Sequence, residues 1–197
     1  MTPDPFTLYS EVHMKNQKMT LANKLTLLRF GLTPVIVVLI LTHLPFFNWV
    51  AFFLFVFTAA LDYFDGYFAR KRNEKSLFGR VLDPIADKFL VIFCYLSLLI
   101  SGHVDSFVSA LLIFVLVLRE VFISGLREQL ASLKIEVPVS QSGKFKTVLQ
   151  FVSIALLIMP TGLDSFYVNG TLLAATAFSL ASAYQYTRVF IKNIDRA

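Results

Sequence analysis

The sequence is poor in the residues that build disulfides and many metal sites, with one cysteine and three histidines in 197 residues. The single cysteine, Cys94, excludes an intramolecular disulfide and any metal site made from several cysteines. His13, His43 and His103 include no pair spaced as metal ligands, so we expect solvated or interfacial positions for them. The first twenty residues lack the apolar core of a cleavable signal peptide, which predicts a loosely ordered polar tail over residues 1–19.

Charge is also scarce. Charged residues make up 16% of the chain, hydrophobic residues make up 56%, and the mean hydropathy is +0.68. Soluble domains are usually about 45–50% apolar. The excess is arranged in long blocks without an internal repeat, which indicates one integral membrane domain over residues 20–197.

The apolar blocks predict an all-α membrane bundle. Uncharged runs occur at Phe30–Asn48, Trp49–Leu61, Phe89–Val104, Ser106–Leu118, Val148–Leu163 and Ser165–Thr187. These runs predict six transmembrane helices, and because several are shorter than the roughly 20 residues of a span, charged neighbours must complete them. Before the first run, leucines at 21, 25, 28 and 32 share one helical face. This predicts an amphipathic interfacial segment, with the start of the first span as the alternative.

Lysine and arginine are absent from the three loops at one end of these helices, where the only charges are Asp105 and Asp164. The positive-inside rule therefore places both termini and the basic loops in the cytoplasm. The net charge of +5 is read as a topology signal, not as a nucleic-acid site. Ionisable groups continue into the second, third and fourth spans from that same side. Such groups are costly in a membrane, so they predict a polar cavity open to the cytoplasm.

Four aspartates lie at the facing ends of the second and third predicted spans. Asp62 and Asp65 are three residues apart and Asp83 and Asp87 four, so each pair shares a helical face. Together the carboxylates would repel one another unless cations bind, and oxygen ligands favour Mg²⁺ or Mn²⁺. Two such ions suit in-line attack at phosphorus. Salt bridges to the basic residues between the pairs are the structural alternative.

The pattern D-x2-D-G-x2-A-R-x8-G-x3-D-x3-D, from Asp62 to Asp87, resembles the signature of the CDP-alcohol phosphotransferases at every fixed position. The resemblance implies a six-helix, homodimeric membrane enzyme in which an alcohol displaces CMP from a CDP-linked lipid. It also implies two divalent cations bridged by Asp62 and Asp83, with Asp65 binding one and Asp87 the other. Asp87 would act as general base on the attacking hydroxyl.

The same resemblance implies contacts to the CDP-lipid. Within the signature these are Gly66, Ala69, Arg70, Ser76 and Gly79. The stretch "ANKLTLLR" resembles the family's segment before its first span, which makes Asn23 and Thr26 candidate nucleotide contacts. Ala22 stands where relatives often have proline, so the local turn departs from the family pattern.

Two further stretches indicate the acceptor. "REVFISGLREQLA" at Arg119–Ala131 and "GKFKT" at Gly143–Thr147 are similar to bacterial members that use sn-glycerol 3-phosphate, with CDP-diacylglycerol as donor and the inner membrane as location. A phosphorylated acceptor needs cationic groups near the metals. The candidates are Arg119, Arg127, Lys144 and Lys146, with Arg188 weaker. Arg119 could instead pair with Glu120, and the lysines could simply flank a span.

Two other functions are weighed against this one. A cardiolipin synthase of the CDP-diacylglycerol type would use phosphatidylglycerol as acceptor, which "REVFISGLRE" disfavours. A transporter or cation channel would need a polar path to both faces, whereas here the ionisable groups gather on one side. Release of CMP from CDP-diacylglycerol separates the enzyme from a transporter.

Overall fold

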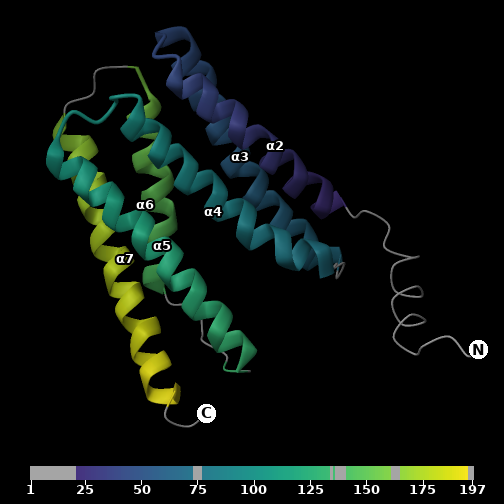
Figure 1. Cartoon of the computed structure of the whole chain (residues 1–197). Coiled ribbons are helices and arrows are strands. Elements are labelled where there is room, and N and C mark those ends of the chain that lie inside the picture. The colour runs from purple at the N-terminus through teal and green to yellow at the C-terminus, as the bar shows by residue number, and fades with distance from the viewer. Residues whose placement is uncertain (1–20, 73–76, 134, 136–140, 161–164, 195–197) are drawn as a thin grey trace, which may run out of the picture.

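The computed structural model describes residues 21–72, 77–133, 135, 141–160 and 165–194. This part of the chain folds into helices and contains no strand, which confirms the all-α prediction (Figure 1). The helices are α2 (Leu21–Leu41), α3 (Pro45–Arg72), α4 (Leu77–Ile100), α5 (Phe107–Ser132), α6 (Gln141–Ile158) and α7 (Ser165–Ile194). The predicted tail over residues 1–19 lies outside the described residues.

Within the residues that the structure describes, three segments are long and apolar enough to cross a bilayer, namely Asn23–Leu41, Phe107–Ser132 and Phe166–Asn193, and Pro45–Leu61 of α3 is a shorter apolar stretch. Large apolar side chains also point outward, among them Phe53 at 64% exposure and Phe107 at 81%. Such surfaces are costly in water and suit a lipid environment. The chain is therefore a helical membrane bundle, and the count of six spans stays a prediction.

The sequence predicts that the long apolar stretch of the first two spans divides at "THLPFFNW", residues 42–49, and the turn between α2 and α3 lies inside that segment. The first uncharged run extends to Asn48, but α2 ends at Leu41 and α3 begins at Pro45. Proline is favoured in the first turn of a helix because its missing N–H has no helical partner there. His43 adopts a positive φ of 58° in the turn. The turn therefore precedes Pro45, and Asn48 belongs to α3.

The helices alternate in direction and form two groups (Figure 1). α2 packs against α3 and α4, while α7 packs against α5 and α6. Contacts of α4 and α3 with α6, and of α4 with α5, join the groups. Where they meet, the core contains Cys94, Tyr95 and Leu98 of α4 and Ile154 of α6, all fully buried. The Tyr95 hydroxyl shares a 2.7 Å hydrogen bond with the Ser153 hydroxyl.

Candidate functional site

The four aspartates lie on consecutive antiparallel helices. Asp62 and Asp65 belong to the last turns of α3, and Asp83 and Asp87 to the first half of α4. The end of α3 and the start of α4 lie close together in Figure 1, at what we call the aspartate end of the bundle. The side chains of Asp62, Asp65 and Asp83 are outside the described residues, so the ligand set remains a prediction.

The predicted CDP contacts in the signature share this position. Gly66, Ala69 and Arg70 are on α3 and Gly79 is on α4, while Ser76 lies outside the described residues. The contacts that their side chains make are not among those described, so their roles also remain predictions. The backbone of the four residues that lie on helices is close to that of the aspartates, because they belong to the same end of α3 and the same start of α4.

Asp87 is the aspartate whose surroundings are described. Arg29 of α2 forms an ion pair with it, with Nη1 donating to Oδ1. The Arg29 side chain is 1% exposed and that of Asp87 is 45% exposed. The guanidinium is thus held inside the bundle, whereas the carboxylate is partly exposed. A charge-assisted hydrogen bond of this kind orients the carboxylate as well as stabilising it.

Arg29 was not among the sequence-predicted site residues, although a signal for it exists. Asn23, Thr26, Arg29 and Thr33 recur at three- or four-residue spacing and are all at most 4% exposed. By contrast, Leu28 is 46% exposed. The inward face of α2 is therefore its polar face, which is the inverse of a soluble amphipathic helix. The predicted nucleotide contacts Asn23 and Thr26 lie on this inward face, about two turns and one turn before Arg29.

The amphipathic segment that precedes the first predicted span is continuous with it. α2 runs without interruption from Leu21 to Leu41. Within the described residues the segment therefore forms the first turns of that helix, in agreement with the alternative given above. Its position at the membrane interface remains a prediction.

The residues predicted to bind the acceptor divide into two pairs. Arg119 and Lys146 are buried, at 8% and 6% exposure. Both contact Glu120: Arg119 Nη1 donates to Glu120 Oε2 at 3.3 Å, and Lys146 Nζ donates to the same oxygen. Arg119 Nε also donates to the carbonyl oxygen of Ser179 at 3.0 Å. We call Arg119, Glu120 and Lys146 the basic cluster; it joins α5, α6 and α7.

The other two predicted residues are exposed. The Arg127 guanidinium lies over the ring of Tyr186, 5.7 Å from its centroid, in a cation–π contact. Lys144 is exposed at the start of α6. The flanking-lysine interpretation therefore fits Lys144, whereas the burial of Lys146 contradicts it for that residue. The alternative pairing of Arg119 with Glu120 is observed.

The middle of α4, directly after Asp87, lies beside the part of α5 that carries the basic cluster. Lys88, which follows Asp87, donates to the Ser124 hydroxyl of α5. Ser124 lies one turn after Glu120, and the charge of Lys88 also interacts favourably with that glutamate. Through this contact α4 is held against α5 within one turn of Glu120.

The opposite end of the bundle has a different character. We call it the histidine end. The Asn48 amide donates to His103 Nε2 at 2.9 Å, and His103 Nδ1 bonds the Ser101 hydroxyl at 2.7 Å. The ring of His43 stacks on His103, with centroids 5.5 Å apart. Since both ring nitrogens of His103 are used, neither is available to a metal.

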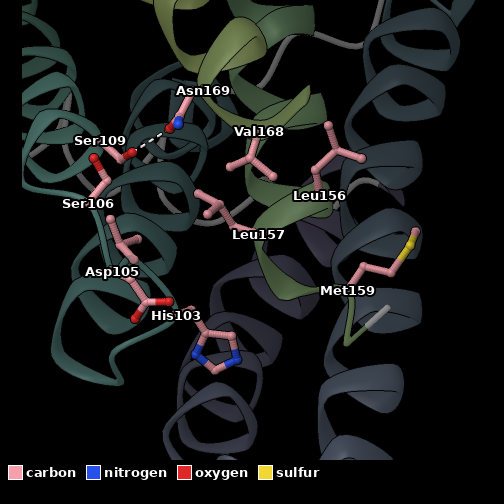
Figure 2. A pocket seen from close by; sticks show the side chains of 10 residues that line it. His103, Asp105, Ser106, Ser109, Leu156, Leu157, Met159, Val168 and Asn169 are labelled. Carbon is pink, nitrogen blue, oxygen red and sulfur yellow. Dashed lines mark hydrogen bonds between the residues drawn. The ribbon is translucent and has the colours of Figure 1, made fainter. Parts of the chain in front are cut away.

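A cavity of about 410 Å³ lies beside this histidine (Figure 2). Its lining combines apolar groups such as Leu157 and Val168 with polar ones. Two of the polar side chains are paired, because the Ser109 hydroxyl donates to Asn169 Oδ1. The predicted polar cavity at the aspartate end is a different feature, and it falls largely on residues whose side chains are not described.

The aspartate end suits hard cations by its chemistry. Its candidate ligands are carboxylate oxygens from the ends of two consecutive helices, the donors that Mg²⁺ and Mn²⁺ prefer. Across the side chains that the structure describes, no group of three or more histidine, cysteine, aspartate or glutamate residues could hold a metal ion. That finding concerns only Asp87 among the four aspartates.

Comparison with known proteins agrees with this chemistry. The sequence model of the CDP-alcohol phosphatidyltransferase family matches residues 19–183. A CDP-diacylglycerol–glycerol-3-phosphate 3-phosphatidyltransferase of Rickettsia bellii is 42% identical over 139 residues, which cover 71% of this chain and 75% of the relative. Proteins of the same name from Cereibacter sphaeroides and Salmonella choleraesuis are 41% and 38% identical, covering 74% and 82% of this chain and 66% and 90% of the relatives.

The family match spans every described helix except the end of α7. It also contains the signature aspartates, Arg29 and the basic cluster. As a class, these enzymes generally depend on divalent metals. On this match and these identities, the chain belongs to the CDP-alcohol phosphatidyltransferase family.

Proposed function

We propose that the chain transfers the phosphatidyl group from CDP-diacylglycerol to sn-glycerol 3-phosphate. The products are phosphatidylglycerophosphate and CMP, and the reaction belongs to phospholipid synthesis. The observation that carries the acceptor assignment is the pair of buried cations, Arg119 and Lys146, beside the helix that bears Asp87. Relatives that carry this activity in their names support it.

The carboxylates of Asp62, Asp65, Asp83 and Asp87 would hold two divalent cations. When bound, these cations neutralise the charge of the donor diphosphate and of the leaving group. The helical signature residues and the inward face of α2, with Asn23 and Thr26, would bind the cytidine and its phosphates.

The chain's own groups then perform the remaining steps. Arg119 and Lys146 bind the phosphate of the acceptor and aim its free hydroxyl at the donor. Asp87, oriented by Arg29, accepts the proton of that hydroxyl. The hydroxyl oxygen forms a bond to the lipid-side phosphorus, and the bond from that phosphorus to CMP breaks. The acyl chains remain in the bilayer.

We propose the bacterial inner membrane as the location, with the aspartate end facing the cytoplasm, and a homodimer as the assembly. The water-soluble substrate supports this orientation, because its phosphate must reach Arg119 and Lys146 from an aqueous side. The distribution of lysine and arginine gives the same orientation.

The test is CMP release by the purified protein with CDP-diacylglycerol and Mg²⁺ or Mn²⁺. Glycerol 3-phosphate is compared with phosphatidylglycerol, inositol phosphate and serine. Turnover restricted to glycerol 3-phosphate is the expected result. Turnover with phosphatidylglycerol instead would establish the cardiolipin synthase alternative, and absence of turnover with every acceptor would contradict the enzyme assignment.

A further inference from the structure

Glu120 holds two buried cations at once. Its Oε2 atom accepts from Arg119 on its own helix and from Lys146 on α6. Consecutive residues on a helix point about 100° apart, so the Arg119 and Glu120 side chains must bend toward each other to meet. A buried cation without an anionic partner is strongly disfavoured, which explains why the contact forms.

The acceptor's phosphate needs the same donors. A phosphate monoester, like a carboxylate, presents anionic oxygens that accept hydrogen bonds from guanidinium and ammonium groups. Arg119 Nε donates to the carbonyl oxygen of Ser179, and Arg119 Nη1 donates to Glu120. If Arg119 and Lys146 bind the acceptor, its phosphate and the Glu120 carboxylate compete for one place.

We propose that Glu120 is an internal anion that takes the position of the acceptor's phosphate between Arg119 and Lys146, and that the acceptor displaces it on binding. This inference rests on the proposed function. It makes Glu120 a residue that sets the affinity for the phosphate: the carboxylate stabilises the ligand-free protein, and binding must first break its contacts. The 15% exposure of Glu120, larger than that of either cation, leaves it a direction in which to move.

The chemistry of the reaction gives a reason for such a residue. The phosphate of glycerol 3-phosphate is not consumed, because the attacking group is a hydroxyl. It is carried into the lipid product, which therefore binds the same two cations. A competing carboxylate weakens the hold on acceptor and product alike, and so favours release of the product into the bilayer.

The experiment measures binding of glycerol 3-phosphate and inorganic phosphate to the full chain in detergent with saturating Mg²⁺. Glu120→Gln retains the shape and one acceptor oxygen but removes the charge. We expect it to melt at a lower temperature without ligand. We also expect its Kd for glycerol 3-phosphate to fall about tenfold or more, because a charge-assisted competitor is lost. In turnover, both KM for the acceptor and kcat should decrease.

Controls separate this inference from the proposed function. Glu128→Gln removes the same charge from an exposed position of the same helix and should leave Kd unchanged. If Arg119→Gln and Lys146→Gln bind glycerol 3-phosphate as tightly as the original protein, the acceptor site itself is wrong. If those variants lose binding but Glu120→Gln shows an unchanged or higher Kd, only the internal-anion role is overturned.

Should Glu120→Gln fail to fold, Glu120→Asp provides a second measurement. It keeps the charge on a side chain one methylene shorter, which weakens contact with two cations at once. We expect a smaller decrease in Kd than for Glu120→Gln. An increase would contradict the inference.

Discussion

The two ends of this bundle both bury polar groups but satisfy them differently. At the aspartate end the contacts are ionic and join different helices, as in Arg29 with Asp87 and Lys146 with Glu120. At the histidine end they are neutral hydrogen bonds that tie two turns together through His103. Ion pairs are an expensive way to hold helices in a bilayer, so their concentration at one end marks the site of chemistry.

The largest expected effect comes from Asp87. Replacing it with asparagine removes the proposed base while preserving the size of the side chain, and general-base catalysis typically contributes about 10²–10⁴-fold. We expect a loss of kcat in that range, measured as CMP release. Asp105→Asn, at the histidine end, is the matched control and should retain activity. An equal decrease of kcat in both variants would contradict the assignment of the chemistry to the aspartate end.

The second comparison lies within the aspartate end, between Lys146 and Lys144. A charged hydrogen bond is worth about 1.5–3 kcal/mol, so Lys146→Gln should raise KM for glycerol 3-phosphate by about 10–100-fold. Exposed Lys144→Gln should change it by less than about threefold. Equal effects of the two substitutions would show that burial does not distinguish a binding lysine from a flanking one.

A smaller effect is expected from Arg29. Arg29→Lys keeps the positive charge but loses the planar fork that fixes the carboxylate of Asp87. We expect kcat to fall about tenfold while KM for glycerol 3-phosphate stays the same, because Arg29 does not touch the basic cluster in the described contacts. Steady-state kinetics with varied acceptor measure both constants. A change confined to KM would contradict the orienting role.

Much of this architecture follows from the sequence, and the exceptions have physical causes. Uncharged runs predict the helices because apolar length is what a bilayer requires. The turn before Pro45 lies within the predicted break, but its bounds are not sharp in the sequence, since both sides of it are equally apolar and only the proline marks it. Lys144 and Lys146 are both lysines at the start of the same helix, so the sequence alone does not distinguish them. Two residues of separation turn the side chains about 200° apart, and only the packing of the helix shows which one faces inward.

Arg29 illustrates the same limit at the site. As a charge among leucines it fits an interfacial segment, but it lies one turn after Leu25 and one turn before Leu32, so a helical wheel does not separate it from them. Which face turns inward depends on the solvent: in a bilayer the polar face is the one that packs against other helices. The inward polar stripe of α2 is therefore readable from sequence only once the helix is known to be a membrane span.

The smallest expected effect concerns the histidine end and depends on pH. Burial lowers the pKa of His103 below its ordinary value, and His43 lowers it further, whereas Asp105 acts in the opposite direction. Because the unfolded chain then binds a proton more readily than the folded one, stability should be complete above the unfolded pKa, near 6.5, and decrease as the pH falls below it.

Thermal unfolding between pH 7.5 and pH 5 measures this dependence. His103→Gln, which can still exchange hydrogen bonds with Asn48 and Ser101, should flatten it relative to the original protein. Exposed His43→Gln should flatten it less, since His43 acts on His103 mainly through its charge. A slope that is unchanged in both variants would place the pH-sensitive groups elsewhere. It would also contradict the comparison between the two ends, in which a neutral imidazole stabilises the histidine end and ion pairs stabilise the aspartate end.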